Sequence, residues 1–319
     1  MNSTMNKAIT LGLVQHTCSV SIEDNLKKTV TGIRDATTKG ANLILLQELH
    51  SSLYFCQKES SDNFNLAESI PGPTSDTLSA LAAELDIVIV ASLFEKRGTG
   101  LYHNTAVVFD GNKGIVGKYR KMHIPDDPGF YEKYYFTPGD YHENIPDNNE
   151  SSAGFVPINT SVGCLGVLVC WDQWFPEAAR LMTLAGADLL LYPTAIGWDP
   201  SDDKEEKSRQ QEAWQTIQRA HAIANGLPVA VCNRTGFESE SAIEAAESEP
   251  NNKKGIQFWG TSFIAGPQGE ILAQAPVDEE TTVVVSIDLK RNEEVRRVWP
   301  YLRDRRIDAY KDLLKRYRD

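Results

Sequence analysis

Apolar stretches of strand length alternate with segments of helical spacing along this chain. Apolar residues fill Ile9–Gln15 and Leu43–Leu46, and between them Ile22–Ala36 carries an apolar residue every three or four positions. The order returns in the second half, where an apolar run over residues 163–169 precedes a helical pattern that begins at Pro176. This alternation predicts a layered α/β fold.

The remaining predicted elements give each half of the chain the same order: strand, helix, strand, helix, strand and hairpin. Residues 122–140 are expected to form an ordered loop, residues 141–153 a polar surface tract, and residues 238–254 an acidic, mobile surface loop. No linker divides the chain, so we expect one domain over residues 1–319. Further strands are expected at Ile87–Phe94, Thr105–Phe109, Ile115–Tyr119, a stretch ending at Pro193, Leu227–Cys232, Phe258–Ala265, Glu270–Ala273 and Thr282–Ile287, and further helices at Ser75–Leu85, Lys204–Asn225 and Arg291–Arg318.

Composition narrows the possible partners. The 319 residues include 41% hydrophobic ones, enough for a large core, and the formal net charge is -12. This acidity argues against nucleic acid or an anionic membrane as the main partner and mildly favours cationic small molecules. The N-terminus lacks the apolar region of a signal peptide, and no run approaches the ~20 apolar residues of a membrane span. We therefore expect a soluble, cytoplasmic protein.

Cysteine and histidine usage predicts neither disulfides nor a metal. The five cysteines are odd in number, widely scattered and without a CxxC pair, so neither a disulfide framework nor a zinc ribbon is indicated. No HxH or HExxH spacing occurs either. A metal hydrolase is therefore the weaker hypothesis, and no metal is expected.

Cys170 lies where the apolar run over residues 163–169 ends and shortly before the helix that begins at Pro176. A helix N-terminus close to a thiol favours the thiolate, so Cys170 is a candidate nucleophile. A cysteine at the end of a strand is nevertheless often inert packing. A nucleophilic thiol also needs a base, and neither His50 nor His123 stands at the end of a predicted strand.

Two other chemically useful residues follow predicted strands. Glu48 comes directly after Leu43–Leu46, and Lys121 follows Ile115–Tyr119. Ligands of open α/β sheets bind at the carboxyl ends of strands, so both side chains can meet Cys170 there. Taken alone, either residue is as well explained by a solvated surface position, but their coincidence at strand ends favours a shared site.

Several motifs together resemble the nitrilase superfamily of carbon-nitrogen hydrolases. They are Glu48 after its strand, KYRKMHIP around Lys121, CWDQWFPEAARLMTLAGADLLLYPTAIG from Cys170, and GTSFIAGPQGEILA near the C-terminus. The resemblance covers roughly Ile9 to Tyr310. It implies a four-layer α-β-β-α sandwich, a catalytic set of Glu48, Lys121 and Cys170, and no organic cofactor or metal. It also implies that Glu132, in GFYEKYYFTPG, is a fourth catalytic residue, and that residues 291–319 pack at the subunit interface of a homo-oligomer, a dimer or larger.

The implied chemistry needs no histidine. Glu48 takes the thiol proton, and the Cys170 thiolate attacks the carbon of a C–N substrate. Lys121 and a backbone N–H after the elbow, expected to be that of Trp171, hold the oxyanion. Glu48 then passes its proton to the leaving amine and later activates water, while Glu132 orients Lys121 and that water.

The residues after the nucleophile resemble those of N-carbamoylputrescine amidases of polyamine biosynthesis. Relatives that cleave N-carbamoyl-D-amino acids carry arginines there, which grip the substrate carboxylate, whereas Gln173 and Trp174 occupy those positions here. A substrate that ends in an ammonium group fits better, so we expect a small cationic carbamoyl amine. The candidate substrate-binding residues are Tyr54, Asp126, Asp127, Tyr131, Trp171, Asp172 and Thr194.

Other activities use the same catalytic set. An ω-amidase, a β-ureidopropionase and a simple nitrilase remain alternatives, as does a binding protein that keeps the fold without catalysis. The presence of Glu48, Lys121 and Cys170 together favours an enzyme.

Overall fold

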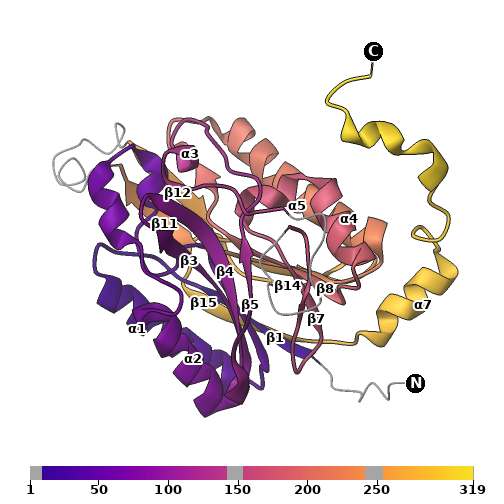
Figure 1. Cartoon of the computed structure of the whole chain (residues 1–319), viewed down its shortest axis with the longest axis horizontal. Coiled ribbons are helices and arrows are strands. Elements are labelled where there is room, and N and C mark those ends of the chain that lie inside the picture. Colours follow the sequence, from indigo (N-terminus) through magenta and orange to yellow (C-terminus); the bar gives the residue numbers. More distant parts are fainter. Residues whose placement is uncertain (1–8, 142–153, 241–253, 319) are drawn as a thin grey trace.

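The computed structural model describes residues 9–141, 154–240 and 254–318, and within them two six-stranded sheets lie between two layers of helices (Figure 1). The first sheet has the order β15-β1-β2-β3-β4-β5, in which β1, β2 and β3 are parallel and the outer strands pair antiparallel. Its strands are β1 (Ile9–Gln15), β2 (Leu43–Leu46), β3 (Val88–Gly98), β4 (Leu101–Asp110), β5 (Gly114–Arg120) and β15 (Thr281–Ile287).

The second sheet repeats this plan in the order β14-β13-β10-β8-β7-β6, with β7, β8 and β10 parallel in its centre. The outer strands again pair antiparallel. The repetition agrees with the two-fold order expected from the sequence. The strands are β6 (Ile158–Asn159), β7 (Cys164–Val167), β8 (Leu189–Thr194), β10 (Val229–Asn233), β13 (Phe263–Ala265) and β14 (Ile271–Gln274).

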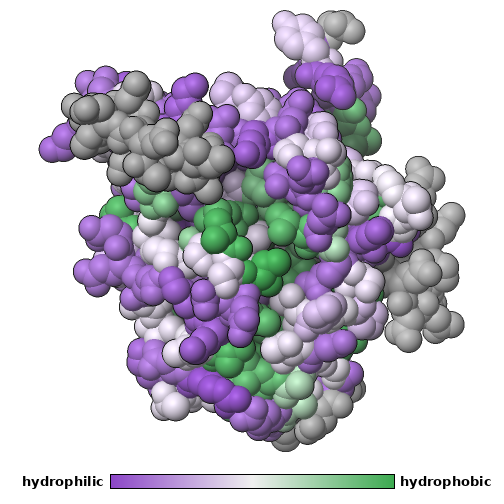
Figure 2. Space-filling view, turned by 90° about the vertical axis from the view of Figure 1, so that its left-hand side faces the viewer, coloured by the Kyte–Doolittle hydropathy of each residue, from purple (hydrophilic) through white to green (hydrophobic). Residues whose placement is uncertain are grey.

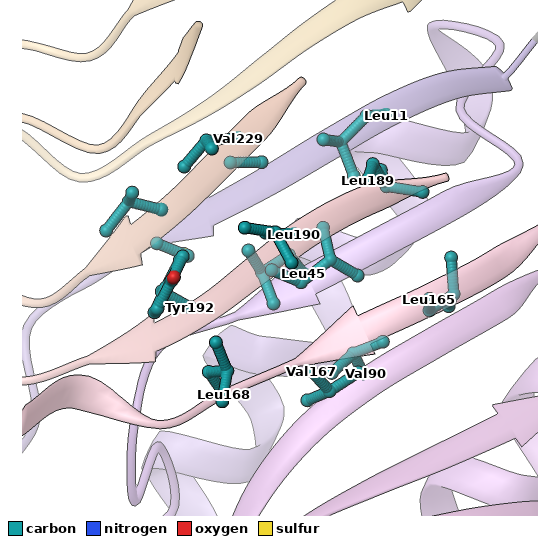
Figure 3. Packing of buried hydrophobic residues seen from close by; sticks show 14 of the residues in the cluster. Leu11, Leu45, Val90, Leu165, Val167, Leu168, Leu189, Leu190, Tyr192 and Val229 are labelled. Carbon is teal, nitrogen blue, oxygen red and sulfur yellow. The ribbon is translucent and has the colours of Figure 1, made fainter. Parts of the chain in front are cut away.

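The alternation of side chains along each strand creates the layers. In β2, Leu43 and Leu45 belong to the core between the sheets, while Ile44 and Leu46 belong to a second core beneath helices. Figure 3 shows the inter-sheet core, in which Leu11, Leu45 and Val90 of the first sheet lie among Leu165, Val167 and Leu189 of the second. Strands that are apolar on both faces are what a sheet covered on both sides requires.

Two pairs of helices close the sandwich. Helices α1 (Ile22–Thr38) and α2 (Pro73–Leu85) cover the first sheet, and α4 (Pro176–Leu184) and α5 (Lys204–Asn225) cover the second (Figure 1). The four-layer α-β-β-α sandwich is therefore confirmed. The Asp203 carboxylate caps α5 by accepting the N–H of Glu206 at 2.8 Å, which fixes the acidic first turn of that helix.

The structure corrects the predicted strand Phe258–Ala265. It breaks into β12 (Gly255–Trp259) and β13, because the chain turns at Gly260 and Thr261 with φ of 50° and 57°. Strand β12 then joins a small third sheet with β11 (Thr235–Ser239) and β9 (Gly197–Trp198).

Two of the predicted loops contain regular secondary structure. Residues 122–140 contain a short helix, α3 (Glu132–Tyr135), that the sequence had not indicated. The expected acidic loop begins inside β11, where Glu238 is buried, and residues 241–253 lie outside the described residues. Most of the polar tract, residues 142–153, also lies outside them.

The C-terminal segment begins against the sandwich, where Asn292 donates to the carbonyl of Asp188 at 2.7 Å and Arg296 to that of Asn225 at 3.0 Å. Instead of one helix over Arg291–Arg318 it forms α7 (Lys290–Val298) and two 3₁₀ turns, Ile307–Ala309 and Lys311–Leu314. Figure 1 shows the part that follows α7 extending away from the sheets and helices. No helix in the described part of the chain is long and apolar enough to cross a membrane.

Candidate active site

The carboxyl ends of the central strands of both sheets meet at one place. Glu48 follows β2 of the first sheet, and Cys170 follows β7 of the second. The main-chain N–H of Glu48 donates to the carbonyl of Thr194, the last residue of β8, at 3.2 Å, so the two sheets are tied together at this point. The ends of β2, β5 and β7 thus deliver Glu48, Lys121 and Cys170, the three side chains that the sequence analysis singled out, to one edge.

Lys121 is fully buried between two carboxylates. Its Nζ lies 2.8 Å from Oε1 of Glu48 and 2.6 Å from Oε2 of Glu132, and none of the three side chains is exposed. The other oxygen of Glu132 accepts the hydroxyl of Tyr54 at 2.7 Å. Glu132, the first residue of α3, therefore belongs to this cluster, and its catalytic role stays a prediction.

Glu48 uses its two oxygens differently. Oε1 accepts both Lys121 Nζ at 2.8 Å and Asn104 Nδ2 at 2.6 Å. Oε2 is buried and has no hydrogen-bond partner among the described residues. A carboxylate oxygen without a partner is costly to bury, and such an exception is typical of a site that takes up a proton or a ligand.

The charges of the cluster shift the pKa of its members. Burial alone lowers the pKa of Lys121, but the carboxylates of Glu132 and Glu48 outweigh burial and hold this pKa well above its usual range. Burial and the negative charge of Glu48 raise the pKa of Glu132 to about 7, although Lys121 opposes the change. Lys121 is accordingly a permanent cation, which suits it to stabilise a developing negative charge.

Cys170 differs from the expectation that a helix N-terminus favours its thiolate. It begins a 3₁₀ turn, Cys170–Trp174, with a φ of 43°, and α4 starts only at Pro176. Burial raises the pKa of the thiol well above its usual value, and Glu48 raises it further, against the opposite effect of Lys121. The resting group is therefore the thiol, which needs a base at the moment of attack.

A cavity of about 580 Å³ opens over this cluster, with Cys170 and Glu132 among its lining residues. Apolar and aromatic side chains form much of the wall. Figure 2 shows hydrophobic residues gathered near the centre of one face of the molecule. The wall residues include Pro125, Pro128, Phe130, Trp171, Trp174, Ile196 and Trp259.

The outer part of the cavity is negatively charged. Asp199 and the first turns of α5 contribute carboxylates, and Arg209 is the one cationic side chain among its described lining residues. Arg209 is itself paired with Glu205 at 2.6 Å and with Glu206 at 2.8 Å. The lining carboxylates are Asp127, Glu132, Asp199, Asp202 and Glu206.

Comparison with known proteins identifies the family. The sequence profile described as "Carbon-nitrogen hydrolase" matches residues 10–297. The chain belongs to the carbon-nitrogen hydrolase family. A solved carbon-nitrogen hydrolase from Helicobacter pylori G27 is 51% identical, covers 98% of this chain and 100% of its own, and superimposes with a TM-score of 0.88.

Proteins of named activity are also similar to this hydrolase. An N-carbamoylputrescine amidase from Solanum lycopersicum is 41% identical over 97% of this chain and 96% of its own length. A citrullinase from Francisella tularensis is 38% identical over 97% of this chain and 99% of its own length. The family and these relatives establish the chain as a hydrolase that acts on a carbon-nitrogen bond of an amide.

The structure separates the predicted substrate-binding residues of this hydrolase into two groups. Asp127 and Trp171 line the cavity. Five others are not among its described lining residues: Tyr54, Asp126, Tyr131, Asp172 and Thr194.

Three of those five have structural contacts instead. Asp172 is fully buried and accepts hydrogen bonds from the Tyr119 hydroxyl at 2.8 Å and from the N–H of His123 at 3.0 Å. Thr194 is fully buried and donates to the Gln173 side chain at 3.2 Å. Tyr54 contributes indirectly, through its hydroxyl bond to Glu132. Asp126 is exposed.

The two residues that replace arginines also point to different places. Trp174 lines the cavity, whereas Gln173 is buried and accepts the indole N–H of Trp214, on α5, at 3.0 Å. At these two positions, therefore, Trp174 contributes an uncharged ring to the cavity, whereas Gln173 contributes to the packing between the nucleophile turn and α5.

Sequence reasoning missed several residues of the site. Asn104 and Arg234 touch Glu48, but a buried asparagine or arginine has no signature in one sequence. The acidic residues at the start of α5 were more accessible to prediction, because the run DPSDDKEE follows closely on the strand that ends at Thr194. Among the described residues, no group of three or more His, Cys, Asp or Glu side chains is arranged to hold a metal ion.

Proposed function

We propose that this hydrolase converts N-carbamoylputrescine and water to putrescine, carbon dioxide and ammonia. The observation that carries the proposal is the cavity over Cys170, which combines an aromatic wall with a rim of carboxylates. The wall suits a four-carbon chain, and the rim suits the terminal ammonium group. Relatives named N-carbamoylputrescine amidase, including one from Arabidopsis thaliana at 41% identity over 97% of this chain, support the same substrate.

The proposed reaction begins at the protonated thiol. Glu48 takes the proton of Cys170 through its free Oε2, and the thiolate attacks the carbamoyl carbon. Lys121 and the Trp171 N–H hold the oxyanion. When the intermediate collapses, the C–N bond breaks, and putrescine leaves with the proton from Glu48.

A carbamoyl group then remains on the sulfur. Glu48 removes a proton from water, and the resulting hydroxide attacks the carbamoyl carbon while Lys121 again holds the oxyanion. The C–S bond breaks, Cys170 recovers its proton from Glu48, and the released carbamate decomposes to carbon dioxide and ammonia. Glu132 orients Lys121 and the water, which its contact with Lys121 and its place in the cavity wall support.

The citrullinase relative and Arg209 favour one second candidate. Citrulline carries the same ureido group but ends in both an ammonium and a carboxylate, and Arg209 lines the cavity as a possible partner for that carboxylate. Because Arg209 is already paired with Glu205 and Glu206, we rank this substrate lower. An ω-amidase or β-ureidopropionase acts on anionic substrates, for which a rim of carboxylates is unfavourable.

The rate of ammonia release from each compound distinguishes these candidate substrates. We expect kcat/KM for N-carbamoylputrescine to exceed that for citrulline and for N-carbamoyl-β-alanine by at least about 10-fold, the difference produced by ~1.4 kcal/mol. Cys170→Ala is expected to abolish turnover and to remain folded. A preference for either acid-bearing compound contradicts the proposed substrate, and turnover by Cys170→Ala contradicts the mechanism.

We also infer that the chain forms a homo-oligomer, at least a dimer. The C-terminal segment exposes many apolar side chains, among them Leu314, which is 94% exposed, and Tyr317, which is 80% exposed. Nearby, Arg180 and Arg296 each have a buried guanidinium nitrogen without a described hydrogen-bond partner. A second copy of the chain can cover the apolar residues and supply acceptors. A cytoplasmic location stays a prediction.

A further inference from the structure

A chain of buried hydrogen bonds leads to Glu48 through two residues that the catalytic set does not include. The N–H of Leu49 donates to Oγ of Ser92 at 3.2 Å. Oγ of Ser92 donates to Oδ1 of Asn104 at 2.8 Å, and Nδ2 of Asn104 donates to Oε1 of Glu48 at 2.6 Å. Ser92, Asn104 and Glu48 have no exposed surface.

The order of donors in this chain fixes the orientation of the Asn104 amide. The carboxylate oxygens of Glu48 can only accept hydrogen bonds, so the NH₂ group of Asn104 must face Oε1 of Glu48. Oδ1 of Asn104 then faces Ser92, whose single hydroxyl proton donates to it. The network itself therefore assigns the side-chain orientation that electron density often leaves ambiguous.

Asn104 and Lys121 together fill Oε1 of Glu48 and leave Oε2 without a partner in the described residues. Asn104 is also tied to Lys121 through the main chain, since the N–H of Lys121 donates to the Asn104 carbonyl at 2.9 Å. One residue of β4 thus holds both the carboxylate and the start of the segment that carries its cationic partner.

We propose that Asn104 is a positioning residue that reserves Oε2 of Glu48 for proton transfer by holding Oε1 in a fixed hydrogen bond. The proposal rests on the assignment of Glu48 as the general base. Asn104 exchanges no proton itself: the proton moves from Sγ of Cys170 to Oε2 of Glu48 and then to the leaving amine.

Asn104 is the neutral donor among several ionisable groups around Glu48. Lys121 approaches from the end of β5 and Glu132 from α3. The Cys170 thiol, in the turn after β7, lies close enough to be affected by the charge of Glu48, and the Arg234 guanidinium after β10 donates to the main-chain carbonyl of Glu48. The Tyr54 hydroxyl also lies close enough to be affected by the charge of Glu48. Replacing Asn104 therefore removes a hydrogen bond without changing the charge of the site.

Loss of Asn104 has two expected effects. The carboxylate is freed to turn about its last torsion, so Oε2 is no longer kept available for proton transfer in every molecule, and kcat falls. The ionised form of Glu48 also loses a donor, so it takes up a proton more readily. The acidic limb of the pH profile of kcat/KM should therefore move to higher pH.

The test compares Asn104→Ala with Thr105→Val. Thr105 is the next residue on β4, faces the opposite side of the sheet, and donates from an equally buried position to Glu95 at 2.6 Å. Each variant removes one buried hydrogen bond to a carboxylate, so both should lose stability. We expect Asn104→Ala to lower kcat by about 10- to 100-fold with little change in KM, and only this variant to shift the acidic limb.

The outcomes are decisive in both directions. Unchanged kcat and pH profile in Asn104→Ala, or equal kinetic effects in Thr105→Val, overturn the proposal. If Asn104→Ala does not fold, Ser92→Ala decides, because it leaves Asn104 in place but removes the proton that orients its amide. We expect a several-fold fall in kcat and the same direction of shift, and no change overturns the proposal. Glu48→Gln is measured in parallel, since activity in that variant overturns the general base itself.

Discussion

The guanidinium of Arg234 donates through Nη2 to the main-chain carbonyl of Glu48 at 2.7 Å and to that of Leu49 at 3.0 Å. Leu49 has a φ of 48°, a conformation that a leucine adopts only when its surroundings enforce it. Nη1 of Arg234 pairs with Glu238 at 2.7 Å, and the other oxygen of Glu238 accepts the N–H of Tyr54 at 2.6 Å. One arginine thus links the turn that carries the base to the segment that contacts Glu132.

Arg234→Lys tests this link, because lysine keeps the charge but lacks the planar fork. We expect kcat to fall by about 10-fold, corresponding to ~1.4 kcal/mol, since the turn around Leu49 relaxes. Arg120→Lys is the matched control, as Arg120 forms a buried pair with Glu95 at 2.7 Å. Equal losses of kcat in the two variants contradict a specific role of Arg234.

Alkylation of Cys170 by iodoacetamide reports on its base. Because burial and Glu48 raise the pKa of this thiol, we expect slow reaction in the absence of proton transfer, and the rate should fall by at least about 10-fold in Glu48→Gln. Peptide mass analysis distinguishes Cys170 from the other cysteines, and Cys170→Ala supplies the blank. An unchanged rate in Glu48→Gln shows that the thiol does not depend on Glu48 for its deprotonation.

A neutral substrate of the same shape tests whether the carboxylates at the start of α5 bind the ammonium group. N-butylurea has the ureido group and four-carbon chain of N-carbamoylputrescine but no ammonium. We expect Asp202→Asn and Glu206→Gln each to raise KM for N-carbamoylputrescine by about 2- to 5-fold, because an exposed ion pair contributes ~0.5–1 kcal/mol. Neither substitution should change KM for N-butylurea.

Glu205→Gln is the control for these two variants. Glu205 is 80% exposed, contacts the same Arg209, and is not among the described residues that line the cavity. It should leave KM for both substrates unchanged. A similar rise in KM for N-butylurea contradicts an electrostatic role of the rim.

The layered α/β arrangement and the common location of Glu48, Lys121 and Cys170 could be predicted because both follow from short-range patterns. Apolar runs such as Leu43–Leu46 predict strands that are buried on both faces, and a charged residue directly after such a run is at the strand's carboxyl end. The roles of Glu48, Lys121 and Cys170 as catalytic residues stay predictions, but the fold places them where ligands of α/β sheets bind.

Long-range contacts explain what the sequence did not predict. Asn104 meets Glu48 across 56 positions of the chain and Arg234 meets it across 186, and neither residue differs locally from ordinary strand or loop residues. The break in the strand Phe258–Ala265 depends on Thr261, which has a positive φ that its own side chain does not favour. Tertiary contacts overrode the local preference at each of these positions.

Two buried histidines should make the fold sensitive to acid. Burial lowers the pKa of His16 to about 4 and that of His50 to about 3, from 6.5 in the unfolded chain, and Thr29 bridges their rings at 3.0 Å from each. The unfolded state therefore binds more protons below pH 6.5. The contribution of the two histidines to the free energy of unfolding is fully present above pH 6.5. It is lost as the pH falls toward 3–4, by up to about 1.4 kcal/mol per pH unit for each imidazole.

Urea unfolding between pH 7.5 and 4.5 measures this loss. His50→Gln should be less stable than the parent protein at pH 7.5 but should show a shallower decline, since one proton-binding group of the unfolded chain is gone. An identical slope in the two proteins contradicts the assignment of the decline to His50.

The exposed C-terminal segment provides the last prediction. Leu314→Asp places a charge on a side chain that is 94% exposed and Leu313→Asp on one that is 65% exposed, so neither substitution disturbs the described core of the protomer. If a second copy covers this segment, the double variant should lower the sedimentation coefficient to that of a smaller species, because burying two carboxylates in an apolar interface is unfavourable. Lys311→Glu changes charge in the same turn and controls for electrostatic effects alone. An unchanged sedimentation coefficient in the double variant assigns the contact between copies to another surface, and a monomeric parent protein contradicts the oligomer altogether.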